Sequence, residues 1–358
     1  MQDYFNVHPR TELKMLYGRK KEVEKLLKVL HASGWAVVLG PRMAGKTSLS
    51  IATAVEYSKD ARTAVIYLNL STAKSFRDLT VRLVSAVSKL KGSRKSNINA
   101  EFSVFIPTGL GSLGFSGKLH RPNEHRVSES FEDAIMTLPP NTVIILDEIQ
   151  EVKGRLDRIT RAFWVVFNER PDIRIVFTGS YSGVVKKVAE AHHEEPMFGR
   201  PPVQIKVLPW ARKTAEEFLI KGLKGCGVNY EDVEIDETIS LLGTLPGWLN
   251  EYGFRRCIGE SHSEALSIVS TSAVQRAKRE LENILKGRGP ASREVVRKLS
   301  EGPKSWSELL STGISKPSLS SLLEVLTDGL FLLKKETIGH RVFYSFTNPV
   351  YRDAARLL

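Results

Sequence analysis

The sequence predicts an α/β domain in which helices cover both faces of a parallel sheet. A small helical domain and a C-terminal module of three helices and a two-stranded ribbon follow it. Two observations predict this order. Five short apolar runs alternate with amphipathic stretches up to residue 208, and the strand signal then stops until about residue 330. Strands buried on both faces are expected to read as continuous apolar runs, which favours a parallel sheet.

The first apolar run, Trp35 to Leu39, ends at a glycine-rich loop, and a helical stretch from Lys46 to Tyr57 follows. The loop reads GPRMAGKTS from Gly40 to Ser48 and fits the pattern G-x-x-x-x-G-K-[ST] of the phosphate-binding P-loop. Strand, glycine loop and helix are the context that this motif requires. The sequence therefore predicts a nucleoside-triphosphate site at the carboxyl end of the first strand.

The loop residues have distinct expected tasks. Gly40 and Gly45 let backbone N–H groups approach the phosphates, because a Cβ would block the approach. Lys46 is expected to reach the β- and γ-phosphates, and Thr47 to place its hydroxyl on Mg²⁺. The whole loop is the candidate nucleotide-binding segment: Gly40, Pro41, Arg42, Met43, Ala44, Gly45, Lys46, Thr47 and Ser48.

The next elements continue the alternation and then break it. Thr63 to Leu70 is a second apolar run, and Phe76 to Leu90 is an amphipathic helix. Residues 91–127 are rich in Gly, Ser and basic residues, with an alternating piece from Phe102 to Ile106. We interpret this stretch as an inserted hairpin or mobile loop.

Two helices and three strands follow the insertion. They are Ser130 to Leu138, Thr142 to Leu146, Leu156 to Glu169, Ile173 to Thr178 and Val203 to Leu208. The second helix is expected to turn Trp164 inward with its other apolar residues.

From Pro209 to Lys286 only helical stretches are predicted, which indicates a small helical lid domain. These stretches are Thr214 to Leu223, Asp236 to Leu242, Pro246 to Arg256 and Ser263 to Leu285. The sequence Gly287-Arg288-Gly289-Pro290 reads as a linker. We therefore expect domains at 1–208, 209–286 and 287–358.

The C-terminal module is predicted to be a winged helix-turn-helix. Its helices are Ser292 to Ser300, Trp306 to Ser311 and Lys316 to Leu326, and its ribbon strands are Leu330 to Lys334 and Arg341 to Phe346. A winged helix docks its third helix in the DNA major groove. Residues 286–358 hold 12 Lys and Arg against 7 Asp and Glu, but the third helix carries Lys316 as its single cation. DNA and a regulatory protein both remain open as partners of this module.

Bulk composition narrows the class. The chain has 358 residues, 42% hydrophobic and 26% charged, so it is expected to bury a core. A net charge of +12 allows an anionic partner but also serves solubility. The two cysteines, Cys226 and Cys257, have no motif spacing and suggest a reducing interior without disulfides. Neither a membrane-spanning run nor a signal peptide is legible, so a cytoplasmic protein is expected, of oligomeric state unknown.

An acidic pair follows the third apolar run. In a P-loop enzyme the acid at this place holds Mg²⁺ through water, which assigns Asp147. Glu148, the next residue, is expected to face the γ-phosphate, where its carboxylate would polarise the attacking water as general base. The alternative for such a pair is a solvated turn or helix cap.

At this point the chain resembles the archaeal ATPases of the AAA+ class, in the signal-transducing STAND branch of P-loop NTPases, over about residues 1–350. The motifs that carry the resemblance are GRKKE at 18–22, the P-loop, LDEIQ at 146–150, FTGS at 177–180, FGR at 198–200 and GTLPGWL at 243–249. The resemblance implies a P-loop AAA+ sheet, ATP or ADP with Mg²⁺ as cofactors, and cytoplasmic ATP hydrolysis.

The resemblance also implies residue roles. Gly18 and Arg19 would lie beside adenine and ribose, or simply start a helix. Thr178 and Ser180 would occupy the sensor-1 position, or be a polar strand end. Arg200 would be an arginine finger, with a surface salt bridge as its alternative.

In the lid, Pro246 matches the G-x-P element of STAND proteins, which would put lid-helix backbone against the nucleotide. Typical AAA+ chains carry a sensor-2 arginine in this domain, and none can be placed here. Gln150 has no role that the sequence assigns.

Three functions fit these observations. The first is an ATP-hydrolysing switch that couples nucleotide state to a partner through the C-terminal module. The second is a DNA-binding AAA+ protein of origin-recognition or clamp-loader type, whose ATPase rate would respond to DNA and salt. The third is a module that binds ADP or ATP tightly with little turnover, which the missing sensor-2 arginine suggests. A small-molecule kinase is a weaker fourth reading.

Overall fold

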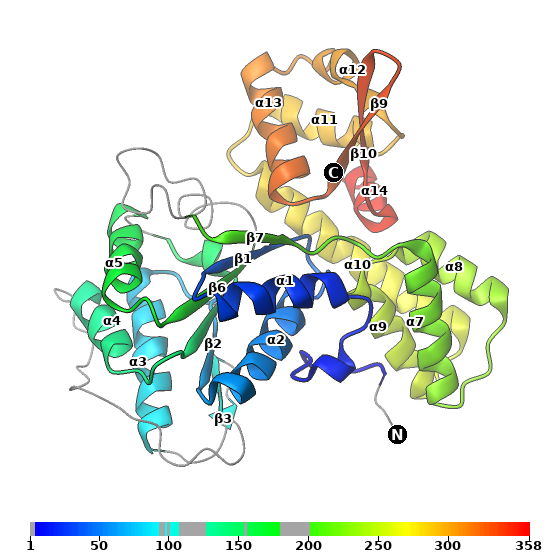
Figure 1. Cartoon of the computed structure of the whole chain (residues 1–358). Helices are drawn as coiled ribbons and strands as arrows, with labels where there is room; N and C mark the ends of the chain where they lie inside the picture. Colours follow the sequence, from blue (N-terminus) through cyan, green and yellow to red (C-terminus); the bar gives the residue numbers. More distant parts are fainter. Residues whose placement is uncertain (1–3, 93–96, 99–100, 107–126, 154–155, 180–200) are drawn as a thin grey trace. The chain divides into compact units, whose positions relative to one another are not determined.

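The computed structural model describes residues 4–92, 97–98, 101–106, 127–153, 156–179 and 201–358, and these form two compact units (Figure 1). The sheet unit comprises Pro9–Leu39 and Lys46–Val207. The lid unit comprises Met1–His8, Gly40–Gly45 and Leu208–Leu358. The boundary between them thus passes through the glycine-rich loop, whose first residues belong to the lid unit.

The sheet unit is built on one seven-stranded sheet with the order β3-β4-β2-β5-β6-β1-β7. Strands β2, β5, β6, β1 and β7 are parallel, and β4 and β3 add antiparallel strands at one edge. The strands are β1 (Ala36–Leu39), β2 (Val65–Asn69), β3 (Asn97–Ile98), β4 (Phe102–Phe105), β5 (Val143–Asp147), β6 (Arg174–Gly179) and β7 (Val203–Lys206).

Helices cover both faces of this sheet. The chain passes from β1 through α2 to β2 in one direction of the strand order, and from β5 through α5 to β6 in the other. Because such crossovers are right-handed, α2 and α5 lie on opposite faces. The helices are α1 (Lys20–His31), α2 (Lys46–Ala61), α3 (Phe76–Gly92), α4 (Val127–Met136) and α5 (Leu156–Glu169), with short 3₁₀ turns at Leu13–Met15 and Ile149–Glu151. The predicted fold class is confirmed.

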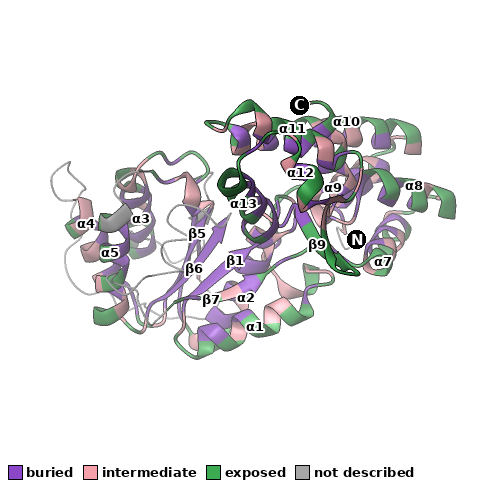
Figure 2. Ribbon diagram, turned by 90° about the horizontal axis from the view of Figure 1, so that it is seen from above, coloured by how far each residue is buried: buried purple, intermediate pink, exposed green. Residues whose placement is uncertain are grey.

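The core of the sheet unit is mostly aliphatic and contains an aromatic cluster, and its central strands are buried (Figure 2). Trp35 meets Phe163 and Phe177 edge-on or tilted, and its indole N–H donates to the Ile173 carbonyl at 3.0 Å. The prediction for Trp164 was wrong, since its side chain is 43% exposed. It lies one residue, or about 100°, past the buried Phe163 on α5.

The inserted stretch contributes β3 and β4 to the sheet. Phe105 pairs with Val65, and Phe102 with Leu68, in antiparallel register. The alternation that predicted a hairpin is therefore present as strand pairing in the described part, and residues 107–126 lie outside it.

In the lid unit, four helices follow one another as predicted: α7 (Arg212–Gly225), α8 (Asp232–Leu242), α9 (Pro246–Cys257) and α10 (His262–Leu285). Ser261 and Glu264 form a reciprocal capping box at the start of α10. The N-terminal segment belongs to this unit, because the Phe5 ring packs edge-on against Phe218 of α7 at 5.3 Å.

The C-terminal module, residues 290–358, has the element order expected of a winged helix. It contains α11 (Pro290–Leu299), β8 (Lys304–Ser305), α12 (Trp306–Leu310), α13 (Lys316–Glu324), a π-helical turn (Val325–Gly329), β9 (Leu333–Ile338), β10 (Arg341–Phe346) and α14 (Pro349–Arg356). Its strands form an antiparallel sheet, β8-β10-β9. The last helix, α14, was not predicted, and it packs on α10 and α8. The predicted division between lid and module at residues 286 and 287 stays a prediction.

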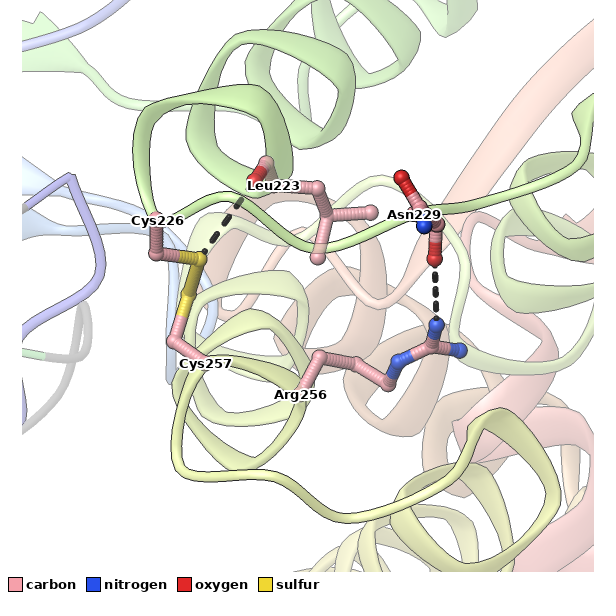
Figure 3. Close-up of a disulfide and its surroundings, with 5 residues drawn as sticks. All are labelled: Leu223, Cys226, Asn229, Arg256 and Cys257. Carbon is pink, nitrogen blue, oxygen red and sulfur yellow. Dashed lines mark hydrogen bonds between the residues drawn. A yellow bond between two sulfur atoms is a disulfide. The ribbon is translucent and has the colours of Figure 1, made fainter.

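The two cysteines form a disulfide, which corrects the expectation from the sequence (Figure 3). Cys226 caps the C-terminal end of α7, and Cys257 is the last residue of α9, with Cα atoms 5.7 Å apart. Beside it, Arg256 donates to the Asn229 carbonyl at 3.0 Å. The pairing is invisible in the sequence because it depends on how α7 and α9 pack.

Within the part of the chain that the structure covers, we find no helix with the length and apolar character needed to cross a bilayer.

We expect the disulfide to stabilise the lid unit. The crosslink joins residues 31 apart, and the loop-closure model gives about 3–4 kcal/mol for a loop of that size. Chemical denaturation with and without reductant measures the difference. The Cys226→Ser/Cys257→Ser variant should match the reduced wild type and ignore reductant. Equal unfolding midpoints for oxidised and reduced wild type would contradict the expectation.

Candidate nucleotide-binding site

The glycine-rich loop has the backbone conformation of an anion cradle. Met43 and Gly45 both have positive φ, 64° and 90°, which side-chain-bearing residues seldom adopt. No heavy atom lies within 4 Å of where a Cβ on Gly45 would stand, so a side chain there would fill open space beside the loop. Helix α2 begins directly afterwards at Lys46, whose side chain is buried. This geometry fits a phosphate group.

The strand register brings the predicted polar residues to one edge of the sheet. Thr178 pairs with Val38 of β1, and Asp147 pairs with Asn69 of β2, so these strands end together at the carboxyl edge. The first residues of α2 follow β1 at this same edge. The ends of β1, β2, β5 and β6 therefore form the floor of the site in the sheet unit.

Asp147 is the centre of this edge. Thr47 Oγ1 donates to its Oδ2 at 2.9 Å, and the Tyr67 hydroxyl donates to the same oxygen at 2.8 Å. Thr178 Oγ1 donates to Oδ1. Three hydroxyl donors from α2, β2 and β6 therefore hold one carboxylate, and Asp147 is 5% exposed. Tyr67 is a residue that sequence reasoning missed.

Burial raises the pKa of Asp147, and the charge of Glu148 adds to the rise, while the three hydroxyl donors oppose it. Burial, together with the Asp147 charge, raises the pKa of Tyr67 far above its usual range. The phenol thus stays protonated and keeps donating. A bound cation would offset the cost of keeping the ionised Asp147 carboxylate away from water.

Glu148 has an unusual backbone at the strand end. Its φ is 56°, and its N–H donates to Thr178 Oγ1 at 3.4 Å. The Gln150 amide donates to the Glu148 carboxylate, which gives Gln150 the contact that sequence reasoning did not assign. Gly179, at φ 142°, lies so close to Gln150 that a Cβ would overlap the amide oxygen. The glycine of the FTGS motif therefore makes room for Gln150.

In the lid unit, α9 begins against the glycine-rich loop. Pro246 is its first residue, and the Gly247 N–H donates to the Met43 carbonyl at 2.9 Å. A Cβ on Gly247 would come within 3.1 Å of the Met43 Cα, so the approach requires glycine. Pro246 thus starts a helix whose first turn contacts the loop backbone.

Of the remaining predicted site residues, the structure describes some and not others. Gly18 has φ 62° and precedes α1, and Arg19 caps that helix, with Nη1 donating to Glu22 Oε1 at 3.2 Å. Burial lowers the pKa of Arg19, and Glu22 opposes the effect. Ser180 and Arg200 lie outside the described residues. Ser48 Oγ accepts from the Arg10 N–H at 3.1 Å, a contact within the sheet unit that joins the segment before α1 to α2.

The donor set fits magnesium. Mg²⁺ commonly takes one or two carboxylates and phosphate oxygens and keeps waters. In the described ranges no three His, Cys, Asp or Glu side chains gather into a dedicated metal cage. Thr47 and Asp147, bonded to each other, are the residues here that would hold the ion beside a nucleotide.

The strand order, the loop after β1 and the acidic pair at the end of β5 match the fold of the P-loop AAA+ ATPases. Two of the solved structures with a similar fold are the following. A Walker-type ATPase of Pyrococcus abyssi has a TM-score of 0.75 at 22% identity, covering 99% of each chain. The ORC2 protein of Aeropyrum pernix, in ADPNP–ADP complexes, has a TM-score of 0.62 at 14% identity, covering 99% of this chain and 95% of that chain. No family model and no curated protein matches the chain.

The burial of Asp147 predicts a pH-dependent cost in stability. Because its pKa is raised in the folded state, the folded protein binds the proton more tightly, and stability falls as pH rises from about 4 through the folded pKa. In nucleotide-free protein with EDTA, Asp147→Asn should therefore gain stability relative to wild type over that window, on the order of 1 kcal/mol.

Thermal unfolding between pH 4 and pH 8 measures this, with the exposed Asp60→Asn as control. A variant at Asp147 that loses stability relative to wild type as pH rises would show that the carboxylate is stabilised when ionised.

Proposed function

We propose that this protein binds ATP with Mg²⁺ and hydrolyses it as a molecular switch of the AAA+ class, in the STAND branch. The reaction is ATP and water to ADP and phosphate. The observation that carries the proposal is the bond between Thr47 of the glycine-rich loop and Asp147 at the end of β5. The likeness in fold to a Walker-type ATPase supports it.

Each site residue has a task in this reaction. Backbone N–H groups from Gly40 to Gly45 would cradle the phosphates, and Lys46 would neutralise their charge. Magnesium, when bound, supplies the positive charge that offsets the charge on the transferred phosphoryl group. Thr47 would contribute its hydroxyl to the ion, and Asp147 would orient the ion's water.

Glu148 would accept the proton of the attacking water. Its left-handed backbone is a strained conformation of the kind that gathers at active sites. The Gln150 amide limits where the carboxylate points, and Thr178 links Glu148 to Asp147. The two carboxylates therefore divide the work: Asp147 serves the ion, and Glu148 serves the water.

The proposed switch function also assigns roles to the other predicted site residues. Gly18 and Arg19 would contact the adenosine, and Pro246 would set the lid helix against the bound nucleotide. Ser180 as sensor and Arg200 as finger stay predictions from the resemblance.

Two substitutions test the proposal. Lys46→Ala should abolish nucleotide binding in calorimetry. Glu148→Gln should bind ATP within about threefold of wild type and lose turnover by about 10²-fold or more, because proton transfer is removed and binding is not.

Glu151→Gln, the same change three residues along the chain, is the matched control and should leave turnover unchanged. If wild type releases no phosphate in a single turnover while still binding ATP, the protein is a tight binding module and not an ATPase. If Lys46→Ala binds as wild type does, the nucleotide site itself is misplaced.

A second candidate function is DNA binding by the C-terminal module as a winged helix. The β9–β10 ribbon favours it, because Lys334 and Lys335 are about half exposed and Arg341 stands at the turn. Lys334 forms an ion pair with Glu336, and Lys335 with Asp328. These ion pairs partly neutralise the positive charge of the ribbon. The similarity in fold to an ORC2 protein supports this second candidate function.

Duplex binding across a salt series tests this candidate. Lys334→Ala/Lys335→Ala/Arg341→Ala should weaken binding and reduce the slope of log affinity against log salt by about 3, one for each lost phosphate contact. Lys213→Ala/Lys221→Ala/Lys224→Ala in α7 removes the same charge elsewhere and should leave the slope unchanged. A ribbon variant that binds as wild type does would leave a protein as the module's partner.

A further inference from the structure

The N-terminal segment docks on two helices of the lid unit. The Phe5 side chain is 6% exposed, and its ring meets Phe218 of α7 edge-on. A Cβ added to Gly222 of α7 would come within 2.1 Å of the Phe5 ring, and one added to Gly253 of α9 within 2.3 Å. The two glycines therefore form a socket for this ring, because a side chain at either position would exclude it.

Hydrogen bonds hold the residue after Phe5 on the same helices. The Asn6 N–H donates to Asn250 Oδ1 of α9 at 3.1 Å, and Asn250 Nδ2 donates to the Asn6 carbonyl at 2.7 Å. The side-chain oxygen of Asn6 also accepts from the His8 N–H at 2.9 Å, which turns the chain at this point. Ring packing and main-chain hydrogen bonds together fix residues 5 and 6 on the lid unit.

The chain passes from one unit to the other directly after these contacts. The first segment of the lid unit ends at His8, and the sheet unit begins at Pro9. The Arg10 N–H then donates to Ser48 Oγ of α2 at 3.1 Å. Even when fully extended, the chain from Asn6 to Arg10 spans at most about 14 Å. It is therefore a short tether between the socket on the lid unit and the helix that follows the glycine-rich loop.

We propose that residues 4–10 form a latch: while Phe5 occupies its socket the bound nucleotide is retained, and withdrawal of Phe5 lets the nucleotide leave. The proposal rests on the nucleotide binding proposed above. In that function both units hold the ligand, since Lys46 belongs to the sheet unit and Pro246 to the lid unit. A tether that limits the separation of the two units then also limits release of the ligand.

The latch differs from the other chain connections between the units in being reversible. The chain also crosses at Leu39–Gly40 and Gly45–Lys46, on either side of the glycine-rich loop, and at Val207–Leu208. Connections of this kind act as hinges, because rotation about their backbone bonds still lets the units move. Phe5, in contrast, is held by packing that can be broken. Burial of a Phe side chain is commonly worth about 10- to 100-fold in an equilibrium constant.

Release of a fluorescent ADP analogue from the full-length protein, chased with excess ADP in the presence of Mg²⁺, tests the latch. Phe5→Ala empties the socket and should speed release about tenfold or more. Val7→Ala is the matched control, because Val7 lies on the same segment and is 63% exposed. It should release the analogue at the wild-type rate, and equal acceleration by both substitutions would contradict the latch.

A longer tether separates a latch from simple packing. An insertion of about six Gly and Ser residues between His8 and Pro9 forms a flexible linker and leaves the contacts of Phe5 and Arg10 in place. The lengthened protein should release the analogue about tenfold or more faster than wild type, while its unfolding midpoint stays that of wild type. This variant decides the matter if Phe5→Ala fails to fold.

The outcomes separate the latch from the function on which it rests. If wild type binds the analogue and both altered proteins release it at the wild-type rate, the latch is wrong while nucleotide binding stands. If Phe5→Ala speeds release and the longer tether does not, Phe5 is a packing residue of the lid unit and the latch is likewise wrong. If wild type binds no nucleotide at equilibrium, the proposed nucleotide function itself fails.

Discussion

The candidate nucleotide site in the sheet unit is organised around one buried carboxylate. Asp147 ends β5 with almost no access to water, so its charge has to be met by groups of the protein or of a ligand. Hydroxyls from three other elements meet it: Thr47 of α2, Tyr67 of β2 and Thr178 of β6. The parallel strand order brings these side chains to one edge, and the site exists because that order places β5 between β2 and β6.

Within the lid unit, the first part of the same loop contacts two helices. Met43 accepts a bond from the first turn of α9, and Arg42 lies near Glu280 of α10. A single loop thus anchors α2, which carries Lys46 and Thr47, and touches helices that lead to the C-terminal module. In the proposed function, a ligand on the loop would act on both units through this covalent connection. The proposed switch would use that connection.

Much of the sheet unit could be predicted from sequence because its signals are local. The P-loop pattern, the apolar strand before it and the acidic pair after Leu146 each occupy a few adjacent residues, and they predicted Thr47 and Asp147 as site residues. Thr178 was predicted from the family resemblance. Tyr67 was not predicted as a site residue, because a tyrosine within an apolar strand is usually interpreted as a core residue. Its role appears only when β2 lies beside β5.

Three further features were predicted wrongly or not at all, each for its own reason. The disulfide joins Cys226 to Cys257 across packed helices, and no spacing rule announces it. Trp164 was expected inside because apolar residues surround it in sequence, while the buried arc of α5 passes through Phe163. Helix α14 had a local signal that went unused: Asn348 caps the helix and Pro349 occupies its first turn. Read alone, Asn-Pro resembles a turn.

In the proposed function, Thr47 and Asp147 together hold magnesium beside the bound nucleotide. Calorimetric titration of ATP with Mg²⁺ and with EDTA, in wild type and in Asp147→Asn, tests this role. We expect Mg²⁺ to strengthen ATP binding by wild type about tenfold or more, and the variant to keep the EDTA affinity but lose the gain. A gain from Mg²⁺ that is equal in both proteins would contradict it.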